Sequence, residues 1–140
     1  MVVRTARHTL IYDPGPLYGP ESDAGQRVVV PYLRHEGVDR IDMMMVTHRD
    51  SDHSGGAASV LSALPVDEVR SSVAGMAGTR CAAGQRWEWD GVVFVVLHPA
   101  EAAPTVNLKS NHLSCVLRIS AGGRHVLLTA DIEAEDEAHL

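Results

Sequence analysis

Residues 47–56, THRDSDHSGG, concentrate side chains that can bind a metal ion. The potential ligands in this segment are His48, Asp50, Asp52 and His53. Two carboxylates this close repel one another, and neutral histidines at pH 7 provide no fixed positive charge to balance them. The segment is therefore unfavourable unless a cation is present. We interpret it as a metal-binding loop rather than a solvated polar loop.

The spacing of these ligands fits two metal centres. His48 and Asp50 can point to one centre, while Asp52 and His53 point to the other. The following pair, Gly55-Gly56, lets the backbone turn tightly and begin a helix whose free N–H groups favour anions near the metal. Two divalent ions about 3.5–4 Å apart can generate hydroxide from water and stabilise charge on a phosphate oxygen. No side-chain nucleophile is then required.

The carboxylate at residue 50 makes the predicted site rich in oxygen ligands. Such sites favour Mn²⁺ or Mg²⁺ relative to sites built from histidine and cysteine. The segment contains no cysteine, so a thiolate zinc site is not expected. We predict Mn²⁺ first, Zn²⁺ second and Mg²⁺ as a third candidate.

Strands and helices alternate around this segment. An apolar run at 41–46 predicts a strand buried on both faces that leads directly into the metal-binding loop. Before it, the sequence predicts a strand at 8–13 and a helix from Ser22 or Asp23 to Glu36, in which Pro31 causes either a kink or a broken first half. After it come a helix at 56–64, a strand at 66–73, a hairpin at 87–97 around Asp90-Gly91, a second hairpin joining 113–120 to 125–129, and the beginning of a helix at Glu133.

Length and composition fit one folded domain over residues 1–140, of mixed α/β (α+β) class. The net charge of −6 counts against a general nucleic-acid binder without excluding one, because bound cations change the balance locally. No apolar run reaches the roughly 18 residues of a membrane span. The first residues lack a secretory pattern.

The string at 48–56 resembles the metallo-β-lactamase superfamily, whose usual signature is His-x-His-x-Asp-His; Asp50 stands where its second histidine usually stands. This variant, followed by Ser54-Gly55-Gly56, is similar to the C-terminal domain of the ComEC family, the channel proteins of bacterial natural transformation. Further stretches resemble that family in the same order, at residues 10–16, 23–33, 84–87, 111–118 and 127–133. The resemblance covers nearly the whole chain.

The resemblance implies further site residues. Asp131 stands where the superfamily places a carboxylate that bridges two metals, so Asp52, His53 and Asp131 are the expected catalytic residues; an ordinary strand-end Asp is the alternative. Ala130 replaces the usual glycine, which is unfavourable if this position needs a positive φ. Asp13 either supports the metal loop or forms a turn. Asn111 could bind metal or substrate, or simply lie in a loop, as we expect of His112.

The fold implied by the family is a four-layer αβ/βα sandwich, of which this chain supplies mainly the first half. Family members normally begin with an Asp-Val-Gly-Gln-Gly strand and continue into a second half containing His-His-Gly-Ser, and neither piece is in this sequence. An apolar sheet face would then be exposed, which favours self-association. We expect the fragment alone to be inactive and the intact parent to be a nuclease.

The function implied is a metal-dependent phosphodiesterase, a nuclease that degrades the non-transforming strand during DNA uptake. Its partners would be DNA, with single strands favoured, and the remainder of a channel protein in the bacterial inner membrane, with this domain on the periplasmic side. Two alternatives stay open. One is a catalytically inactive DNA-guiding or structural domain of the channel, and the other is a small-molecule hydrolase of the same superfamily.

The chain contains two cysteines, Cys81 and Cys115, far apart in the sequence. They are either two buried thiols or one disulfide, and a disulfide would require an oxidising compartment.

Overall fold

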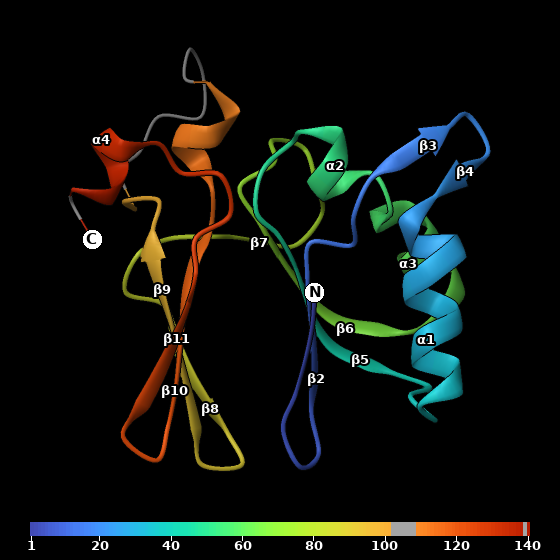
Figure 1. Ribbon diagram of the computed structural model, residues 1–140, viewed down its shortest axis with the longest axis horizontal. Helices are drawn as coiled ribbons and strands as arrows, with labels where there is room; N and C mark the ends of the chain where they lie inside the picture. The colour runs from blue at the N-terminus through green and yellow to red at the C-terminus, as the bar shows by residue number, and fades with distance from the viewer. Residues whose placement is uncertain (102–108, 139) are drawn as a thin grey trace.

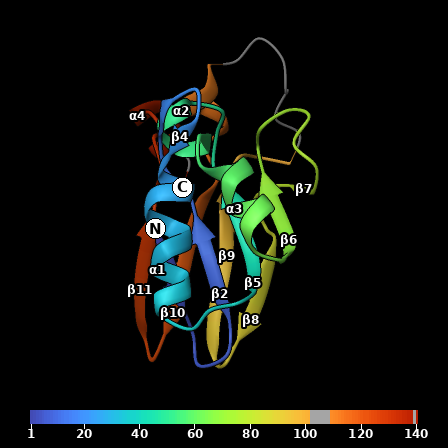
Figure 2. The same ribbon diagram turned by 90° about the vertical axis from the view of Figure 1, so that its right-hand side faces the viewer.

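The computed structural model describes residues 1–101, 109–138 and 140. Two sheets pack face to face, and helices cover the outer face of the first sheet (Figures 1 and 2). The first sheet has the strand order β1-β2-β5-β6-β7, and the second has the order β11-β10-β9-β8. The layer order is thus helix, sheet, sheet, which agrees with the α/β class and with part of an αβ/βα sandwich.

The first sheet places the metal-binding loop at one of its ends. β2 and β5 are parallel, as are β5 and β6 and then β6 and β7, while β1 is antiparallel to β2. The carboxyl ends of the parallel strands therefore meet along one edge. The bounds are β1 (Val2–Arg4), β2 (Thr9–Tyr12), β5 (Ile41–Val46), β6 (Val66–Ser71) and β7 (Thr79–Arg80).

The expectation that residues 41–46 are buried on both faces is confirmed. Met43 and Met45 pack into the core between the two sheets, where Phe94 and Leu117 also lie. Met44 and Val46 pack on the opposite face, beneath the helices. This double burial explains why the run shows no polar alternation.

The second sheet consists of antiparallel hairpins, and both predicted hairpins are confirmed. In the first of them, Asp90 and Gly91 adopt the positive φ angles that a tight two-residue turn requires. A short 3-10 helix, Ser110–Leu113, replaces the beginning of the strand expected at 113–120. The strands are β8 (Arg86–Trp89), β9 (Val92–His98), β10 (Val116–Ala121) and β11 (Arg124–Leu128).

The helix expected from Ser22 or Asp23 begins later, so this part of the prediction is wrong. The short strands β3 (Leu17–Gly19) and β4 (Ser22–Asp23) form a hairpin of their own. A π-helical turn at Gly25–Val29 then leads into α1 (Val30–His35), with Pro31 in its first turn. Pro31 is compatible with that position because it lacks only an N–H that has no partner there.

The remaining helices are short and follow the metal-binding loop or end the chain. α2 (Ser51–Ser54) lies inside the predicted loop itself, and α3 (Ala57–Ala63) confirms the helix expected at 56–64. α4 (Ala134–Glu137) is the helix expected to begin at Glu133. Within the described ranges, no helix is long and apolar enough to cross a bilayer.

A disulfide joins Cys81 to Cys115, with 5.9 Å between their Cα atoms. Both residues are fully buried in the core between the sheets. Cys81 follows β7 and Cys115 precedes β10, so the bond ties the first sheet to the second. Of the two alternatives left open by the sequence, the structure has the disulfide.

Candidate metal centre

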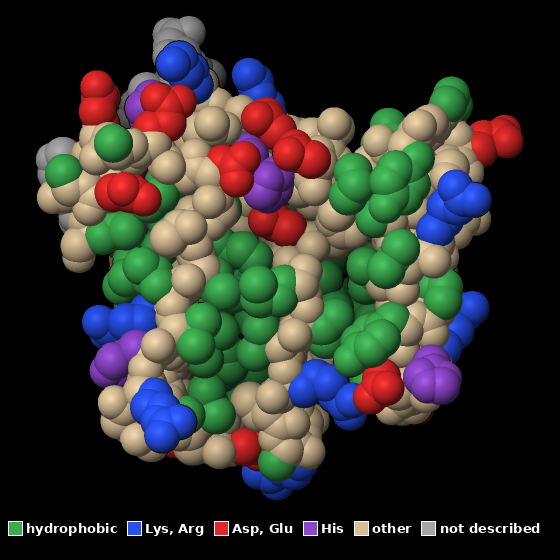
Figure 3. Space-filling view, in the orientation of Figure 1, with side chains coloured by type: hydrophobic (Ala, Val, Ile, Leu, Met, Phe, Trp, Pro, Cys, Tyr) green, Lys and Arg blue, Asp and Glu red, His purple; other side chains and the backbone are tan. Residues whose placement is uncertain are grey.

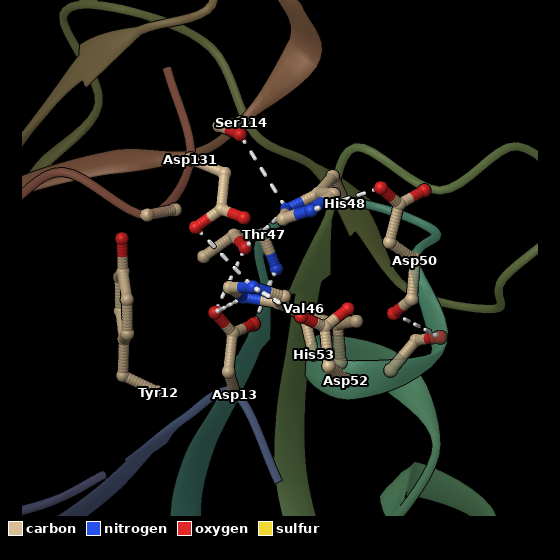
Figure 4. A network of polar contacts seen from close by, with 12 residues as sticks. Tyr12, Asp13, Val46, Thr47, His48, Asp50, Asp52, His53, Ser114 and Asp131 are labelled. Atoms are coloured by element: carbon tan, nitrogen blue, oxygen red, sulfur yellow. Dashed lines mark hydrogen bonds and ion pairs between the residues drawn. The ribbon is translucent and has the colours of Figure 1, made fainter. Parts of the chain in front are cut away.

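The predicted ligands converge at the carboxyl end of the parallel strands (Figure 4). The loop after β5 supplies His48 and Asp50, and α2 supplies Asp52 and His53. Asp131 arrives from the other sheet, three residues beyond the end of β11. Ligand atoms of His48, His53 and Asp131 all lie within 4.8 Å of one another, although His48 and Asp131 are 83 positions apart in the sequence.

Asp13, which directly follows β2, fixes the ring of His53. Its Oδ2 accepts a hydrogen bond of 2.7 Å from His53 Nδ1. The other ring nitrogen, Nε2, therefore faces the cluster, 3.3 Å from Asp131 Oδ1 and 3.7 Å from Asp52 Oδ2. The hydrogen bond to Asp13 and the surrounding carboxylates raise the pKa of His53 to about 9. This environment stabilises positive charge at the point where a metal would bind.

Thr47 connects Asp13 to the second histidine. Its hydroxyl donates to Asp13 Oδ2 at 2.8 Å, and its backbone N–H donates to Asp13 Oδ1 at 2.8 Å. Because the hydroxyl has a single proton, it must accept at its 3.0 Å contact with His48 Nδ1. His48 is then protonated at Nδ1, and the lone pair of Nε2 is free to bind a cation.

His48 Nε2 is a buried polar atom with no hydrogen-bond partner among the described residues. Such atoms are rare in folded proteins, and binding of an ion is one accepted reason for them. Burial, followed by the charge of His53, lowers the pKa of His48, so the ring is neutral, as a metal ligand must be. These residues therefore fit a divalent cation.

The exposed carboxylates form the rim of the cluster and pair with the histidines as the sequence spacing suggested. Asp50 Oδ2 lies 3.7 Å from His48 Nε2, and Asp52 lies beside His53. The side chains of Asp50, Asp52 and Asp131 are 45%, 67% and 47% exposed, so solvent and substrate can reach them. Asp50 is also held by Ser110, whose Oγ donates to Asp50 Oδ1 at 2.6 Å.

Ala130 has a φ of +48°, the conformation in which its replacement of glycine is unfavourable. The residue directly precedes Asp131 and turns the chain from β11 toward the cluster. An L side chain is strained here, but the turn is retained and Asp131 still reaches His53.

Asn111 and His112 lie in the 3-10 helix near the site. Among the described residues, no hydrogen bond or ion pair joins either side chain to the cluster. His112 instead contacts Asp136 in α4, with 2.7 Å between His112 Nδ1 and Asp136 Oδ2. This contact directs the His112 ring toward α4.

Sequence reasoning did not single out three hydroxyl residues around the cluster. Thr47 bridges Asp13 and His48, Ser110 holds Asp50, and Ser114 Oγ lies 3.4 Å from His48 Nδ1. Thr47 had a local signal, as a hydroxyl at the end of a buried strand beside a ligand. Ser110 and Ser114 had none, because they are about 60 residues away in the sequence.

Comparison with known proteins agrees with this geometry. The sequence model of the family described as "Metallo-beta-lactamase superfamily" matches residues 1–139 of this chain. This match implies binding of divalent metal ions, which the His/Asp cluster is suited to hold.

Three known proteins are similar to this chain over most or all of its length. "Competence protein ComA" of Neisseria gonorrhoeae is 38% identical over 100% of this chain and 19% of its own length. "Uncharacterized protein YcaI" of Escherichia coli is 33% identical over 98% of this chain and 18% of its own. "Recombination protein 2" of Haemophilus influenzae is 35% identical over 91% of this chain and 16% of its own. The chain spans less than a fifth of each relative.

Solved structures support the fold. A metallo-β-lactamase from Cronobacter sakazakii with a HARLDQ motif aligns with a TM-score of 0.63 at 15% identity, over 91% of this chain and 50% of that one. The Rm3 metallo-β-lactamase aligns with a TM-score of 0.58 at 14% identity, over 90% of this chain and 52% of that one. The described fold therefore corresponds to about half of these proteins.

Proposed function

Because this chain belongs to the metallo-β-lactamase superfamily, we propose that it is the metal-dependent phosphodiesterase part of a DNA-uptake protein. In this role it degrades the DNA strand that is not imported during transformation. The observation that carries the proposal is the convergence of His48, His53 and Asp131 around a buried, unpartnered nitrogen. The names of the competence and recombination relatives support DNA as the substrate.

In the proposed centre, His48 and Asp50 would hold one metal ion, Asp52 and His53 would hold a second, and Asp131 would complete the set of ligands. The oxygen-rich set favours Mn²⁺, followed by Zn²⁺ and Mg²⁺. When bound, such ions would supply a hydroxide nucleophile and stabilise charge on the phosphate. Asp52, His53 and Asp131 are the proposed catalytic residues, at the exposed side of the cluster.

Residues behind the ligands have a positioning role in this proposal. Asp13 fixes the ring orientation and protonation of His53, and Thr47 does the same for His48. Hydrogen bonds to the far nitrogen of a metal-bound histidine raise its basicity and define which nitrogen binds. Asn111 follows Ser110, which holds Asp50, in the 3-10 helix, and it is a proposed contact for substrate.

The proposed setting is a larger channel protein of the bacterial inner membrane, with this domain on its periplasmic side. The disulfide between Cys81 and Cys115 supports that side, because disulfides persist in oxidising compartments. Single-stranded DNA and the remainder of the channel are the proposed partners. Exposed Val126 and Leu127 on β11, the outermost strand of the second sheet, support self-association of the isolated chain.

A second candidate is a DNA-guiding domain of the channel without catalytic turnover. The strained Ala130 favours it, because this residue sets the direction of the proposed bridging carboxylate. The net charge of −6 favours it less directly, since the chain offers little general attraction for phosphates.

Metal binding and nuclease activity separate the two candidates. We expect both the isolated chain and the full-length protein that contains it to bind Mn²⁺. We expect the full-length protein to cleave single-stranded DNA. Asp52→Asn should reduce cleavage at least about 100-fold, because it removes an anionic ligand. The matched control, Asp136→Asn, lies outside the cluster and should cleave normally.

Metal binding without cleavage in the intact parent would favour the DNA-guiding domain. If the cleavage rate of full-length Asp52→Asn stays within about threefold of that of the unmutated full-length protein, a different site must carry out the reaction.

A further inference from the structure

The β3–β4 hairpin presents unpartnered apolar side chains to solvent beside the metal cluster. Tyr18 is 57% exposed and Leu17 is 50% exposed. Within the described part of the chain, the Tyr18 ring stacks on no other ring and its hydroxyl forms no hydrogen bond. Apolar side chains gather over β3 directly beside the acidic and histidine side chains of the cluster (Figure 3).

The hairpin packs against α2, the helix that carries Asp52 and His53. β3 and α2 are in contact, and they lie side by side in Figure 1. A Cβ added at Gly55, the residue that ends α2, would lie 2.2 Å from Leu17 N and 2.7 Å from Pro16 C. Gly56 N also donates to Gly15 O at 2.9 Å. The position of Tyr18 is therefore fixed relative to Asp52 and His53 by backbone contacts.

The charges around the cluster leave phosphate attraction as a weak means of holding a nucleic acid. Asp50, Asp52 and Asp131 are all exposed there, and the chain as a whole carries −6. Bound metal ions offset part of this charge, but only at the reacting phosphate. A nucleotide next to that phosphate gains most from a contact that does not depend on charge. Stacking of a base on an exposed aromatic ring is such a contact.

From these observations we propose that Tyr18 is a stacking platform for one nucleobase of a single strand whose phosphodiester lies at the metal cluster. The inference rests on the proposed function and adds how the substrate is recognised. It predicts a preference for unpaired over paired DNA, because a base inside a duplex cannot offer its face to Tyr18. It also predicts tolerance of sequence, since every base has such a face.

The test is fluorescence anisotropy of the 140-residue chain with Mn²⁺ and a phosphorothioate-linked single strand, compared with an otherwise identical abasic strand. The chain should bind the normal strand about 10-fold more tightly than the abasic strand, the effect of one stacked base. Tyr18→Ala should bind both strands equally weakly, and Tyr18→Phe should keep the preference. Tyr32→Ala, which removes another exposed tyrosine ring (45% exposed) from α1, is the matched control and should behave like the unmutated chain.

The outcomes distinguish this inference from the function on which it rests. If the parent chain binds the normal strand and Tyr18→Ala binds it equally well, the platform is wrong while the phosphodiesterase proposal stands. Equal loss in Tyr18→Ala and Tyr32→Ala would also overturn it, because the effect would then be general apolar attraction. If the chain binds neither strand, the platform is wrong, whereas the proposed function fails only if the full-length protein does not cleave single-stranded DNA.

Discussion

At the scale of single residues, Asp13 organises the site although it is not an expected ligand. One carboxylate accepts hydrogen bonds from His53, from the Thr47 hydroxyl and from the Thr47 backbone. It does so from a backbone with φ of +54°, a conformation that Asp tolerates better than most residues. Asp13 thereby links the ends of β2 and β5 to both histidines.

We expect Asp13→Ala to weaken Mn²⁺ binding about 10- to 100-fold, the range typical for loss of a partner behind a metal ligand. The reason is that His53 loses its fixed orientation. Isothermal titration calorimetry measures the effect, with Asp39→Ala, an exposed carboxylate away from the cluster, as the control. Unchanged affinity in Asp13→Ala would show that the ring is held by packing alone.

The backbone at Ala130 leads to a stability prediction. Ala130→Gly should raise the free energy of unfolding by about 1 kcal/mol, because glycine adopts a positive φ without steric cost. Urea unfolding of the metal-free chain measures it. Ala58→Gly, in the exposed part of α3, should instead lower stability by about 1 kcal/mol. A loss of stability in Ala130→Gly would mean that the Ala130 methyl contributes more by packing than it costs in strain.

At the scale of elements, the two sheets are fastened at both ends. Near the cluster, the disulfide joins them and the Tyr12 hydroxyl contacts the Cys115 and Leu128 carbonyls at 2.7 and 3.0 Å. Closing a loop of 34 residues stabilises by about 4 kcal/mol in the chain-entropy account. At the far end, Asp90 accepts hydrogen bonds from Thr5, Arg7 and His8, and so joins the β8–β9 turn to the β1–β2 turn.

The Asp90 contacts predict a dependence of stability on acid pH. Hydrogen bonds from Thr5, His8 and Arg7, in that order, lower the pKa of Asp90 far below its usual value of 3.8. A lowered pKa means that the stabilisation is complete above about pH 4 and is lost as the pH falls further.

We expect Asp90→Asn to lower the melting temperature at neutral pH and to flatten the remaining pH dependence below about pH 4. Asp39→Asn is the control. Thermal unfolding across this range measures both effects. An identical acid profile in the variant and the parent would show that Asp90 does not couple the two hairpins.

At the scale of the whole molecule, the chain combines an acidic cluster with an open apolar surface. Val126 and Leu127 are exposed on β11, which has a neighbour on one side only. Outermost strands with exposed apolar side chains favour pairing with another chain.

We therefore expect the isolated chain to form dimers or larger species in light scattering, and Leu127→Glu to shift it toward the monomer. Leu61→Glu places the same charge on α3, in the helical layer, and should leave the oligomeric state unchanged. A monomeric parent chain at high concentration would rule out this association.

The sequence by itself determined the parts of the site that are continuous in the chain. His48, Asp50, Asp52 and His53 were recognisable because a short loop beside a buried strand forces their charges together, whatever the rest of the fold does. The buried strand at 41–46 and both hairpins followed from equally local patterns of hydrophobicity and turn residues.

Asp13 and Asp131 were expected from the resemblance to the family, but only the tertiary structure shows how these distant groups meet the loop. The positions of Asp13, Ser110 and Asp131 depend on how two sheets pack, and so does the choice between a disulfide and two thiols. The β3–β4 hairpin was also missed, because its short strands are stabilised by each other and by the backbone of α2 rather than by a periodic apolar pattern. Contacts of this kind arise from packing between segments far apart in the chain, which no local spacing records.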